Sequence, residues 1–296
     1  MVDESPAALH CTAAAVPRAS LLRSPLSVSR DSGGGVSVRE VRRVHVLKFG
    51  SSVLARPAAY RSVAEEIRAE VSGGANVVAV VSAMGDTTDD LLAAAREVAP
   101  SLPDDLMGSL LATGEEASVA LLRLALATAG VRAVGMSFWH LPVRTQGPLG
   151  SADPVAVDAR RIETAFAAHD AIVLPGFVGV DETGVTSLLG RGGSDLTALF
   201  LGHALGATEV RLVKDVDGIF PADPKRFPDI APLRTATWRE ARRTAGGVVQ
   251  DRALRFAEDH RIPFRVAAPG GTGTWVGRHD PAHDRNSGRK ASARCA

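Results

Sequence analysis

The turn Gly190-Arg191-Gly192-Gly193-Ser194-Asp195 follows a short apolar run at residues 185–189 and precedes an amphipathic stretch at residues 196–205. This order predicts a strand, a glycine-rich turn and a helix. Glycine takes backbone φ values that other residues resist, and the first turn of a helix presents unpaired N–H groups and the positive end of its dipole. Arg191 can hold a carboxylate or a phosphate through two parallel hydrogen bonds. We therefore predict an anion-binding turn; a turn that serves packing alone is the alternative.

Apolar runs and amphipathic stretches alternate along the rest of the chain. Such alternation predicts an α/β fold, a three-layer αβα sandwich around a mostly parallel central sheet, in which ligands bind at the carboxyl ends of the strands. The predicted strands are residues 44–49, 76–81, 131–138, 171–174, 185–189, 209–213, 263–266 and 274–276. The predicted helices are residues 57–71, a helix from residues 87–89 onward, 104–129 with interruptions at Gly108 and Gly114, 154–168, 196–205 and two within 237–259.

Composition and charge narrow the possible partners and the compartment. The chain has 296 residues, of which 45% are hydrophobic, so it can bury a sizeable core. Its formal net charge is +1, which gives no reason to expect a nucleic acid or an anionic membrane as a partner. No apolar run reaches the roughly 18 residues of a membrane-spanning helix. The two cysteines, Cys11 and Cys295, lie near the ends of the chain, which favours a reducing compartment, the cytoplasm.

Three regions are predicted along the chain. Residues 1–42 are rich in Ala, Ser, Arg and Pro and are expected to be a disordered or low-complexity extension, or the product of a start codon assigned too early. Asp3 and Glu4 do not suit an organelle transit peptide. Residues 43–278 are expected to form the catalytic domain, and residues 279–296 a polar tail. His279 and His283 lie four residues apart in that tail, but no third metal ligand is evident, so no metal site is assigned.

The first predicted strand ends in a second polar turn. Lys48 lies one residue before the end of this strand, and Gly50-Ser51-Ser52 follows. Burying an ammonium is costly unless it finds a partner, and the adjacent turn offers amide and hydroxyl donors. We predict that this turn holds a phosphoryl group. The alternative is that Lys48 reaches solvent at the end of the strand.

Three further sites carry polar chemistry. Residues 82–89, Ser-Ala-Met-Gly-Asp-Thr-Thr-Asp, suit a carboxylate or a phosphate, although Ser and Thr also cap helices without any ligand. Residues 214–220, Lys-Asp-Val-Asp-Gly-Ile-Phe, end another strand with carboxylates that can orient a lysine, hold ribose hydroxyls or meet magnesium through water. An ordinary Asp-Gly turn is the alternative at Asp217-Gly218. Glu115, taken alone, is interpreted as a solvated helix charge.

These segments, in this order, resemble the amino-acid kinase family, and aspartate kinases in particular. The resemblance spans roughly residues 44–277. The family's Lys-Phe-Gly-Gly-Thr-Ser-Val, Val-Val-Ser-Ala-Met-Gly-x-x-Thr-Asp, Gly-Glu, Gly-Arg-Gly-Gly-Ser-Asp and Thr-Asp-Val-Asp-Gly-x-Tyr-x-x-Asp-Pro-Arg patterns correspond to residues 48–53, 80–89, 114–115, 190–195 and 214–225. The fourth of these is matched in full.

The resemblance implies a carbamate kinase-like fold and a reaction. ATP with Mg²⁺ would phosphorylate a carboxylate, with L-aspartate giving 4-phospho-L-aspartate as the expected case, in a homodimeric enzyme. Lys48 and Asp195 would be catalytic. The substrate would be bound by Ser82, Thr88, Glu115 and Arg191. The nucleotide would be bound by Gly50, Ser51, Ser52, Lys214, Asp215, Asp217, Phe220 and Lys225. No protein ligand to a metal is assigned.

Several positions depart from the aspartate kinase pattern. The opening motif is one residue shorter and closer to that of glutamate 5-kinase, Lys214 replaces Thr, and Phe220 replaces Tyr. Val248 takes the place of a lysine that contacts the nucleotide phosphates in the family. Lys214 or Arg252 are the candidates to compensate for that lost charge.

These departures keep two other functions open. One is a kinase for a different small acid, such as a glutamate-like compound or a substrate of specialised metabolism. The other is a non-catalytic homologue that binds a nucleotide or an amino acid and regulates a partner. The paired ligand-sensing domains of most aspartate kinases are not recognised after Gly277, so feedback inhibition by lysine or threonine is not expected unless a second subunit supplies it.

Overall fold

The structure, a computed structural model, describes residues 43–99, 101, 103–223, 226–227, 229–244 and 247–278. The chain divides into two units, Met1–Val41 and Arg42–Ala296, and every described residue lies in the second. The predictions for residues 1–42 and 279–296, including both cysteines and the histidine pair, lie outside the described residues, as does Lys225. Within the described ranges, no helix is both long enough and apolar enough to cross a bilayer.

The described residues build an eight-stranded central sheet in the order β10-β12-β11-β9-β1-β2-β6-β3. Neighbouring strands pair in parallel except β11 with β12. The run predicted at residues 76–81 is buried along its whole length in β2, as expected for a strand covered on both faces. The bounds are β1 (Arg43–Phe49), β2 (Ala75–Val81), β3 (Ala133–Gly135), β6 (Ala171–Pro175), β9 (Glu209–Val213), β10 (Thr235–Ala236), β11 (Phe264–Ala267) and β12 (Thr274–Val276).

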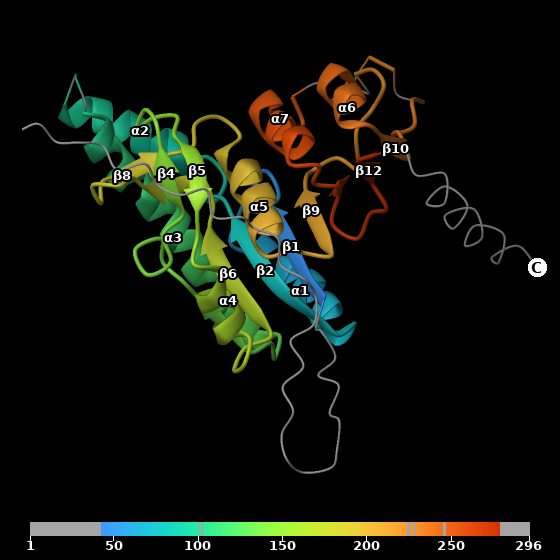
Figure 1. Cartoon of the computed structure of the whole chain (residues 1–296), viewed down its shortest axis with the longest axis horizontal. Coiled ribbons are helices and arrows are strands. Elements are labelled where there is room, and N and C mark those ends of the chain that lie inside the picture. Colours follow the sequence, from blue (N-terminus) through green and yellow to red (C-terminus); the bar gives the residue numbers. More distant parts are fainter. Residues whose placement is uncertain are drawn as a thin grey trace, which may run out of the picture. The chain divides into compact units, whose positions relative to one another are not determined.

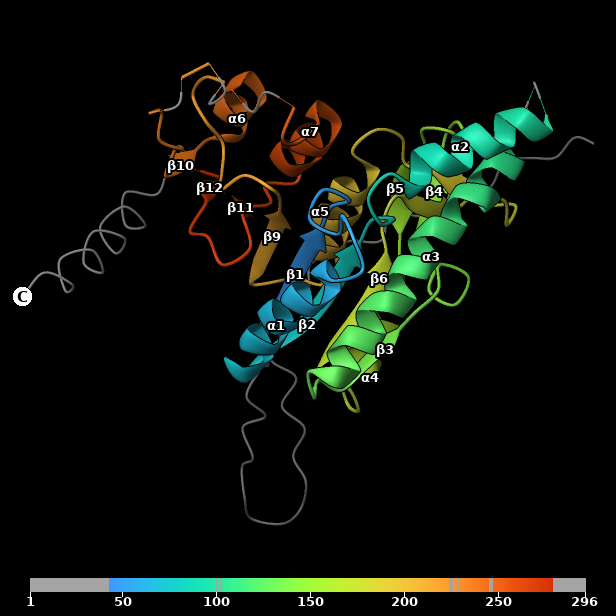
Figure 2. The ribbon, with the colours of Figure 1, turned by 180° about the vertical axis from the view of Figure 1, so that it is seen from behind.

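Helices cover both faces of this sheet. Figure 2 shows α1 (Ala59–Ser72) and α3 (Asp104–Thr128) over one face, with α2 (Thr87–Val98) packed on α3. The other face carries α4, α5, α6 and α7 (Figure 1). Their bounds are α4 (Ala159–Ala165), α5 (Gly193–Ala204), α6 (Trp238–Thr244) and α7 (Asp251–Asp259). The predicted three-layer sandwich with a mostly parallel sheet is therefore confirmed.

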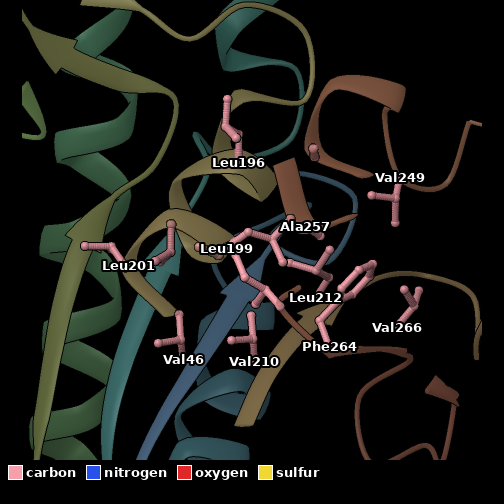
Figure 3. Packing of buried hydrophobic residues seen from close by; sticks show 14 of the residues in the cluster. Val46, Leu196, Leu199, Leu201, Val210, Leu212, Val249, Ala257, Phe264 and Val266 are labelled. Atoms are coloured by element: carbon pink, nitrogen blue, oxygen red, sulfur yellow. The ribbon is translucent and has the colours of Figure 1, made fainter. Parts of the chain in front are cut away.

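Side chains of β1 alternate between the two faces of the sheet, and this alternation determines the face on which Lys48 lies. Leu47 and Phe49 pack in the cluster shared with α1 and α3, whereas Val46 packs in the cluster shared with α5 and α7. Figure 3 shows this second cluster, in which Val46 lies near Leu199 and Val210. Successive strand residues point to opposite faces, so Lys48 shares the face of Val46. Its side chain therefore projects toward the face that α5 covers.

A second, four-stranded sheet has the order β5-β4-β7-β8. Its strands are β4 (Arg144–Gln146), β5 (Asp153–Ala156), β7 (Val178–Val180) and β8 (Thr186–Leu188). The strand predicted at residues 185–189 is present as β8, but it pairs antiparallel with β7 and is not part of the parallel sheet. The glycine-rich turn therefore follows a strand of the small sheet, and the helix after the turn, α5, packs on the large sheet. Helix α5 begins at Gly193, three residues before the predicted start, so Asp195 lies in its first turn.

The interruptions predicted at Gly108 and Gly114 are wrong, because α3 is continuous from Asp104 to Thr128. Both glycines serve close packing instead. A Cβ at Gly108 would lie 2.9 Å from the carbonyl oxygen of Thr186, and one at Gly114 would lie 3.2 Å from the Cβ of Ala83. The missing side chains let α3 approach β8 and the turn after β2.

Two other predicted elements also differ from the structure. Residues 154–168 form the strand β5 and then the short helix α4, because Pro154 lies on the edge strand of the small sheet, where a missing N–H is tolerated. The side chain of Asp158 accepts a hydrogen bond from the amide of Arg161 and marks the true helix start. The strand predicted at residues 131–138 is limited to β3, since Phe138 leaves the sheet to pack with Leu111 and Val178.

Candidate active site

The ends of two neighbouring parallel strands bring two lysines to one carboxylate. Lys48, in β1, lies 2.9 Å from Asp195, measured from Nζ to Oδ1. Lys214, directly after β9, donates a hydrogen bond of 2.7 Å from Nζ to Oδ2 of the same carboxylate. The Asp195 side chain is only 4% exposed. Strands β1 and β9 end in register, with Phe49 opposite Val213, so the two lysines reach the same edge of the sheet. This places three of the predicted turns at one point.

The charges of this Lys–Asp–Lys cluster do not cancel. Burial opposes the ionisation of Asp195, but the ammonium groups of Lys48 and Lys214 outweigh it and hold the pKa of Asp195 below its usual value. Burial and the neighbouring Lys48 lower the pKa of Lys214, against the attraction of Asp195. Two ammonium groups share one carboxylate, so the ionised cluster carries a surplus of one positive charge. A site of this kind is suited to an anion.

The turn before α5 needs its glycines for geometry. Gly190 has φ = 70° and Gly192, the N-cap of α5, has φ = 76°. Both values lie in the left-handed region that side chains disfavour. A Cβ at Gly192 would also lie 2.5 Å from the Cγ of Gln250. The turn can therefore place Arg191 beside the helix start only with glycine on both sides. Arg191 itself is exposed, and within the described residues its guanidinium has no hydrogen-bond partner.

These groups surround a cavity of about 300 Å³. Inside it, the hydroxyl of Ser82 donates a 3.0 Å hydrogen bond to that of Ser194, which links the turn after β2 to α5. The amides of Ser51 and Ser52 donate to no other group in the described part of the chain. Ten residues predicted from the sequence line the cavity: Lys48, Gly50, Ser51, Ser52, Ser82, Thr88, Glu115, Arg191, Asp195 and Lys214.

Three of the described residues that were predicted to bind the nucleotide do not line the cavity. Asp215 is exposed and accepts a 3.4 Å hydrogen bond from the hydroxyl of Ser52. The Oδ1 atom of Asp217 accepts a 3.1 Å hydrogen bond from the amide of Ala268, so this carboxylate holds the turn between β11 and β12. Phe220 is half-buried outside the cavity lining. Lys225 is not described.

Phe177 and Gln250 also line the cavity and were not predicted, whereas Ser194 belongs to the predicted anion-binding turn but had no role assigned. Phe177 has φ = 68°, a left-handed backbone that is rare for an aromatic residue, and its amide donates to the hydroxyl of Thr197. The signal available in the sequence was its position, two residues after the carboxyl end of the buried run that becomes β6. Gly247 and Val248 also line the cavity, and neither brings a charge to it.

Glu115 is buried rather than solvated, so the interpretation of this residue taken alone is wrong. It lies on α3, is 3% exposed and lines the cavity. Its Oε2 atom has no hydrogen-bond partner among the described residues. Burial raises the pKa of Glu115 to about 8, against the weaker effects of the Ala83 amide and Lys48. The carboxyl group is therefore neutral at pH 7, and a cation placed beside it would favour its ionisation.

Glu115→Gln is expected to raise the free energy of unfolding, and to raise it more at high pH. A carboxyl with a folded-state pKa of about 8 and an ordinary unfolded-state value near 4.5 destabilises the protein progressively as the pH rises between those two values. The difference reaches at most about 5 kcal/mol. Urea unfolding of both proteins at pH 5, 6.5 and 8 measures it. Glu97→Gln, at an exposed position on α2, is the control, and a pH-independent difference would contradict the assignment.

The fold and the cavity define an α/β protein whose pocket, at the carboxyl ends of parallel strands, is suited to anionic ligands. Within that class the chain belongs to the amino acid kinase family, which matches residues 43–268. It is 40% identical to the aspartokinase of Mycobacterium tuberculosis (strain ATCC 25618 / H37Rv) over 225 residues, which cover 75% of this chain and 53% of that protein. The chain thus spans about half the length of the curated relatives it matches.

Solved structures agree with this family. The chain resembles the aspartate kinase from Synechocystis with a TM-score of 0.67 and 29% identity, over 79% of this chain and 39% of that one. It resembles the carbamate kinase from Giardia lamblia with a TM-score of 0.60 and 13% identity, over 81% of this chain and 99% of that one. The second likeness concerns the fold alone. The carbamate kinase-like fold expected from the sequence is therefore confirmed.

Proposed function

We propose that the chain is an ATP-dependent kinase that phosphorylates the side-chain carboxylate of an amino acid, converting L-aspartate to 4-phospho-L-aspartate. The observation that carries the proposal is the buried Lys48–Asp195–Lys214 cluster, whose surplus positive charge faces a cavity lined by two turns rich in amides and hydroxyls. Membership of the amino acid kinase family and the similarity to aspartokinases support it.

Each residue of the site has a distinct role in the proposed phosphoryl transfer. Lys48 and Lys214 neutralise the phosphoryl group in transfer, and Asp195 holds both ammonium groups in place. The amides of Gly50, Ser51 and Ser52 donate hydrogen bonds to phosphate oxygens. The remaining assignments place the substrate carboxylate on Arg191, its ammonium on Glu115, further substrate contacts on Ser82 and Thr88, and the nucleotide beside Asp215, Asp217, Phe220 and Lys225.

The reaction requires positioning and charge neutralisation more than covalent help from the protein. A carboxylate oxygen of the acid attacks the γ-phosphorus of ATP, the bond to the oxygen that bridges the β- and γ-phosphates breaks, and ADP leaves with the negative charge. Lys48 and Lys214 meet the charge on the equatorial oxygens. An oriented ammonium pair in a poorly solvated pocket needs little rearrangement at that moment.

The cavity's donor set fits a polyphosphate better than a bare metal ion. Among the residues that the structure describes, no group of three or more His, Cys, Asp or Glu side chains could hold a metal. The Asp195 carboxylate is already shared between two lysines. Mg²⁺ would therefore be held by the phosphates of ATP, whose charge it partly neutralises when bound.

An ADP-release assay across several acids tests the proposal. Purified protein with ATP and Mg²⁺ is expected to release ADP when L-aspartate is added and to form hydroxylamine-trappable acyl phosphate. Turnover with only L-glutamate or another acid would show that L-aspartate is not the substrate, while the proposed kinase activity would stand. Binding of ATP without turnover on any acid would overturn the enzymatic function.

That last outcome corresponds to a second candidate, a non-catalytic homologue that binds ligands and regulates a partner. One observation favours it: Gly247 and Val248 bring no charge to the part of the cavity where family members carry a lysine. The presence of the Lys48–Asp195–Lys214 cluster favours the enzyme, since Lys214 supplies a second ammonium. The homodimer and the cytoplasmic location expected from the sequence stay predictions.

A further inference from the structure

Arg252, near the start of α7, directs both terminal nitrogens of its guanidinium to residues that do not line the cavity. Its NH1 group donates to the hydroxyl of Ser151 and to the carbonyl oxygen of Leu189. Its NH2 group donates to the carbonyl oxygens of Ser151 and Ala152 and to the carboxylate of Asp153, at 2.6 Å. A guanidinium engaged in this way is not available to a phosphate. Of the two cations that could compensate for Val248, only Lys214 therefore faces the cavity.

The atoms that Arg252 holds flank the turn that carries Arg191. Leu189 directly precedes Gly190, and a Cβ at Gly190 would lie 3.0 Å from the hydroxyl of Ser151. The segment around Ser151 is tied to β8 as well, because the amide of Ala152 donates to the carbonyl oxygen of Leu188. Arg252 thus joins α7 to the residue that precedes the turn and to the 151–153 segment that lies against it.

The other side of the same turn is braced from the same segment of chain. Gln250, two residues before Arg252, packs its side chain against Gly192, where no Cβ would fit. Gly190 and Gly192 are the two residues on either side of Arg191. The turn is therefore held at the two glycines that flank Arg191 by Gln250 and Arg252, while the Arg191 side chain remains exposed and without a partner in the described residues.

We propose that Arg252 is a positioning residue that fixes the 190–193 turn and so sets the affinity of Arg191 for the acid substrate. The inference rests on the proposed function. A lysine could not replace this arginine, because one ammonium with three N–H groups cannot reach the five acceptors that are shared between the two terminal nitrogens of Arg252. Loss of the fork frees the base of the turn, and a freed Arg191 must lose more conformational entropy when it closes on a carboxylate.

The test compares two neighbouring arginines of α7. Arg252→Gln and Arg252→Lys are expected to raise the KM for L-aspartate at least about tenfold, equivalent to about 1.4 kcal/mol, and to leave the KM for ATP within about twofold. Arg255→Gln is the matched control. Arg255 lies one turn away in the same helix, and among the described residues its 62% exposed side chain pairs only with Asp251. The control should leave both KM values unchanged.

A merely structural role is separated from a positioning role by the pattern of the losses. An unchanged KM for L-aspartate in Arg252→Lys would overturn the proposal. An equal rise in the KM for L-aspartate and the KM for ATP, together with a lower melting temperature, would also overturn it. If Arg252→Gln does not fold, Arg252→Lys and Asp153→Asn, which removes only the exposed carboxylate of the pair, decide the outcome.

A double-mutant cycle tests whether Arg252 acts through Arg191. Arg191→Ala alone should raise the KM for L-aspartate, and Arg252→Lys added to it should raise the KM no further. A full additional increase would overturn the proposal. Failure of the proposed function gives a different result, since the wild-type protein would then show no turnover. In that case titration calorimetry with L-aspartate and ADP replaces the KM, and a wild-type protein that binds no acid would overturn both.

Discussion

Asp195→Asn is expected to lower kcat by at least about a hundredfold and to destabilise the fold by about 3–5 kcal/mol. The carboxylate of Asp195 is the shared partner of Lys48 and Lys214, and its side chain is 4% exposed. A neutral amide leaves two buried ammonium groups facing each other without compensation, so one of them must lose its proton or move toward solvent. Either response removes the charge arrangement on which phosphoryl transfer depends.

Two measurements follow this variant separately. Steady-state ADP release gives kcat, and urea unfolding gives the free energy of unfolding. Asp259→Asn, at an exposed position near the end of α7, makes the same chemical change without a buried partner and should leave both unchanged. A folded Asp195→Asn protein with wild-type kcat would remove the cluster from the mechanism.

The sequence predicted the parts of the site that depend on local order. Apolar runs ending in polar turns identified β1, β2 and β9, and parallel pairing places their carboxyl ends at one edge of the sheet. For this reason Lys48, Ser82 and Lys214 line one cavity, as their positions in the sequence suggested. The convergence of these three turns was predictable because each follows a largely buried strand of the parallel sheet.

The sequence could not predict features that depend on contacts between distant segments. The small sheet escaped prediction because its strands are short, three or four residues each, and Pro154 within one of them suggested a helix start. Gly108 and Gly114 suggested breaks in α3, although each allows a close approach that appears only in three dimensions. The burial of Glu115 and the five acceptors of Arg252 escaped prediction for the same reason. Glu115 is buried near Lys48 and Ala83, and the acceptors of Arg252 lie 63 to 101 residues away along the chain.

Lys48→Ala is expected to leave the fold intact and to lower kcat at least tenfold, which distinguishes it from Asp195→Asn. Asp195 keeps one ammonium, because Lys214 still donates its 2.7 Å hydrogen bond, so no buried charge is left alone. The cluster, however, changes from a net charge of +1 to zero. The loss of one charge-assisted contact of about 1.5–3 kcal/mol, felt in the transition state, corresponds to roughly a tenfold to hundredfold lower rate.

The comparison of kcat with KM assigns the lost contact. A lysine that neutralises the phosphoryl group in transfer should affect kcat more than the KM for L-aspartate, because its interaction strengthens only as charge develops. Arg96→Ala, on the exposed side of α2, removes a cation without touching the cavity and should change neither value. Unchanged kcat in Lys48→Ala would show that the surplus charge is not used. A higher KM for ATP at constant kcat would instead assign Lys48 to ground-state binding of the nucleotide, and Lys214 alone would then remain to meet the charge of the transition state.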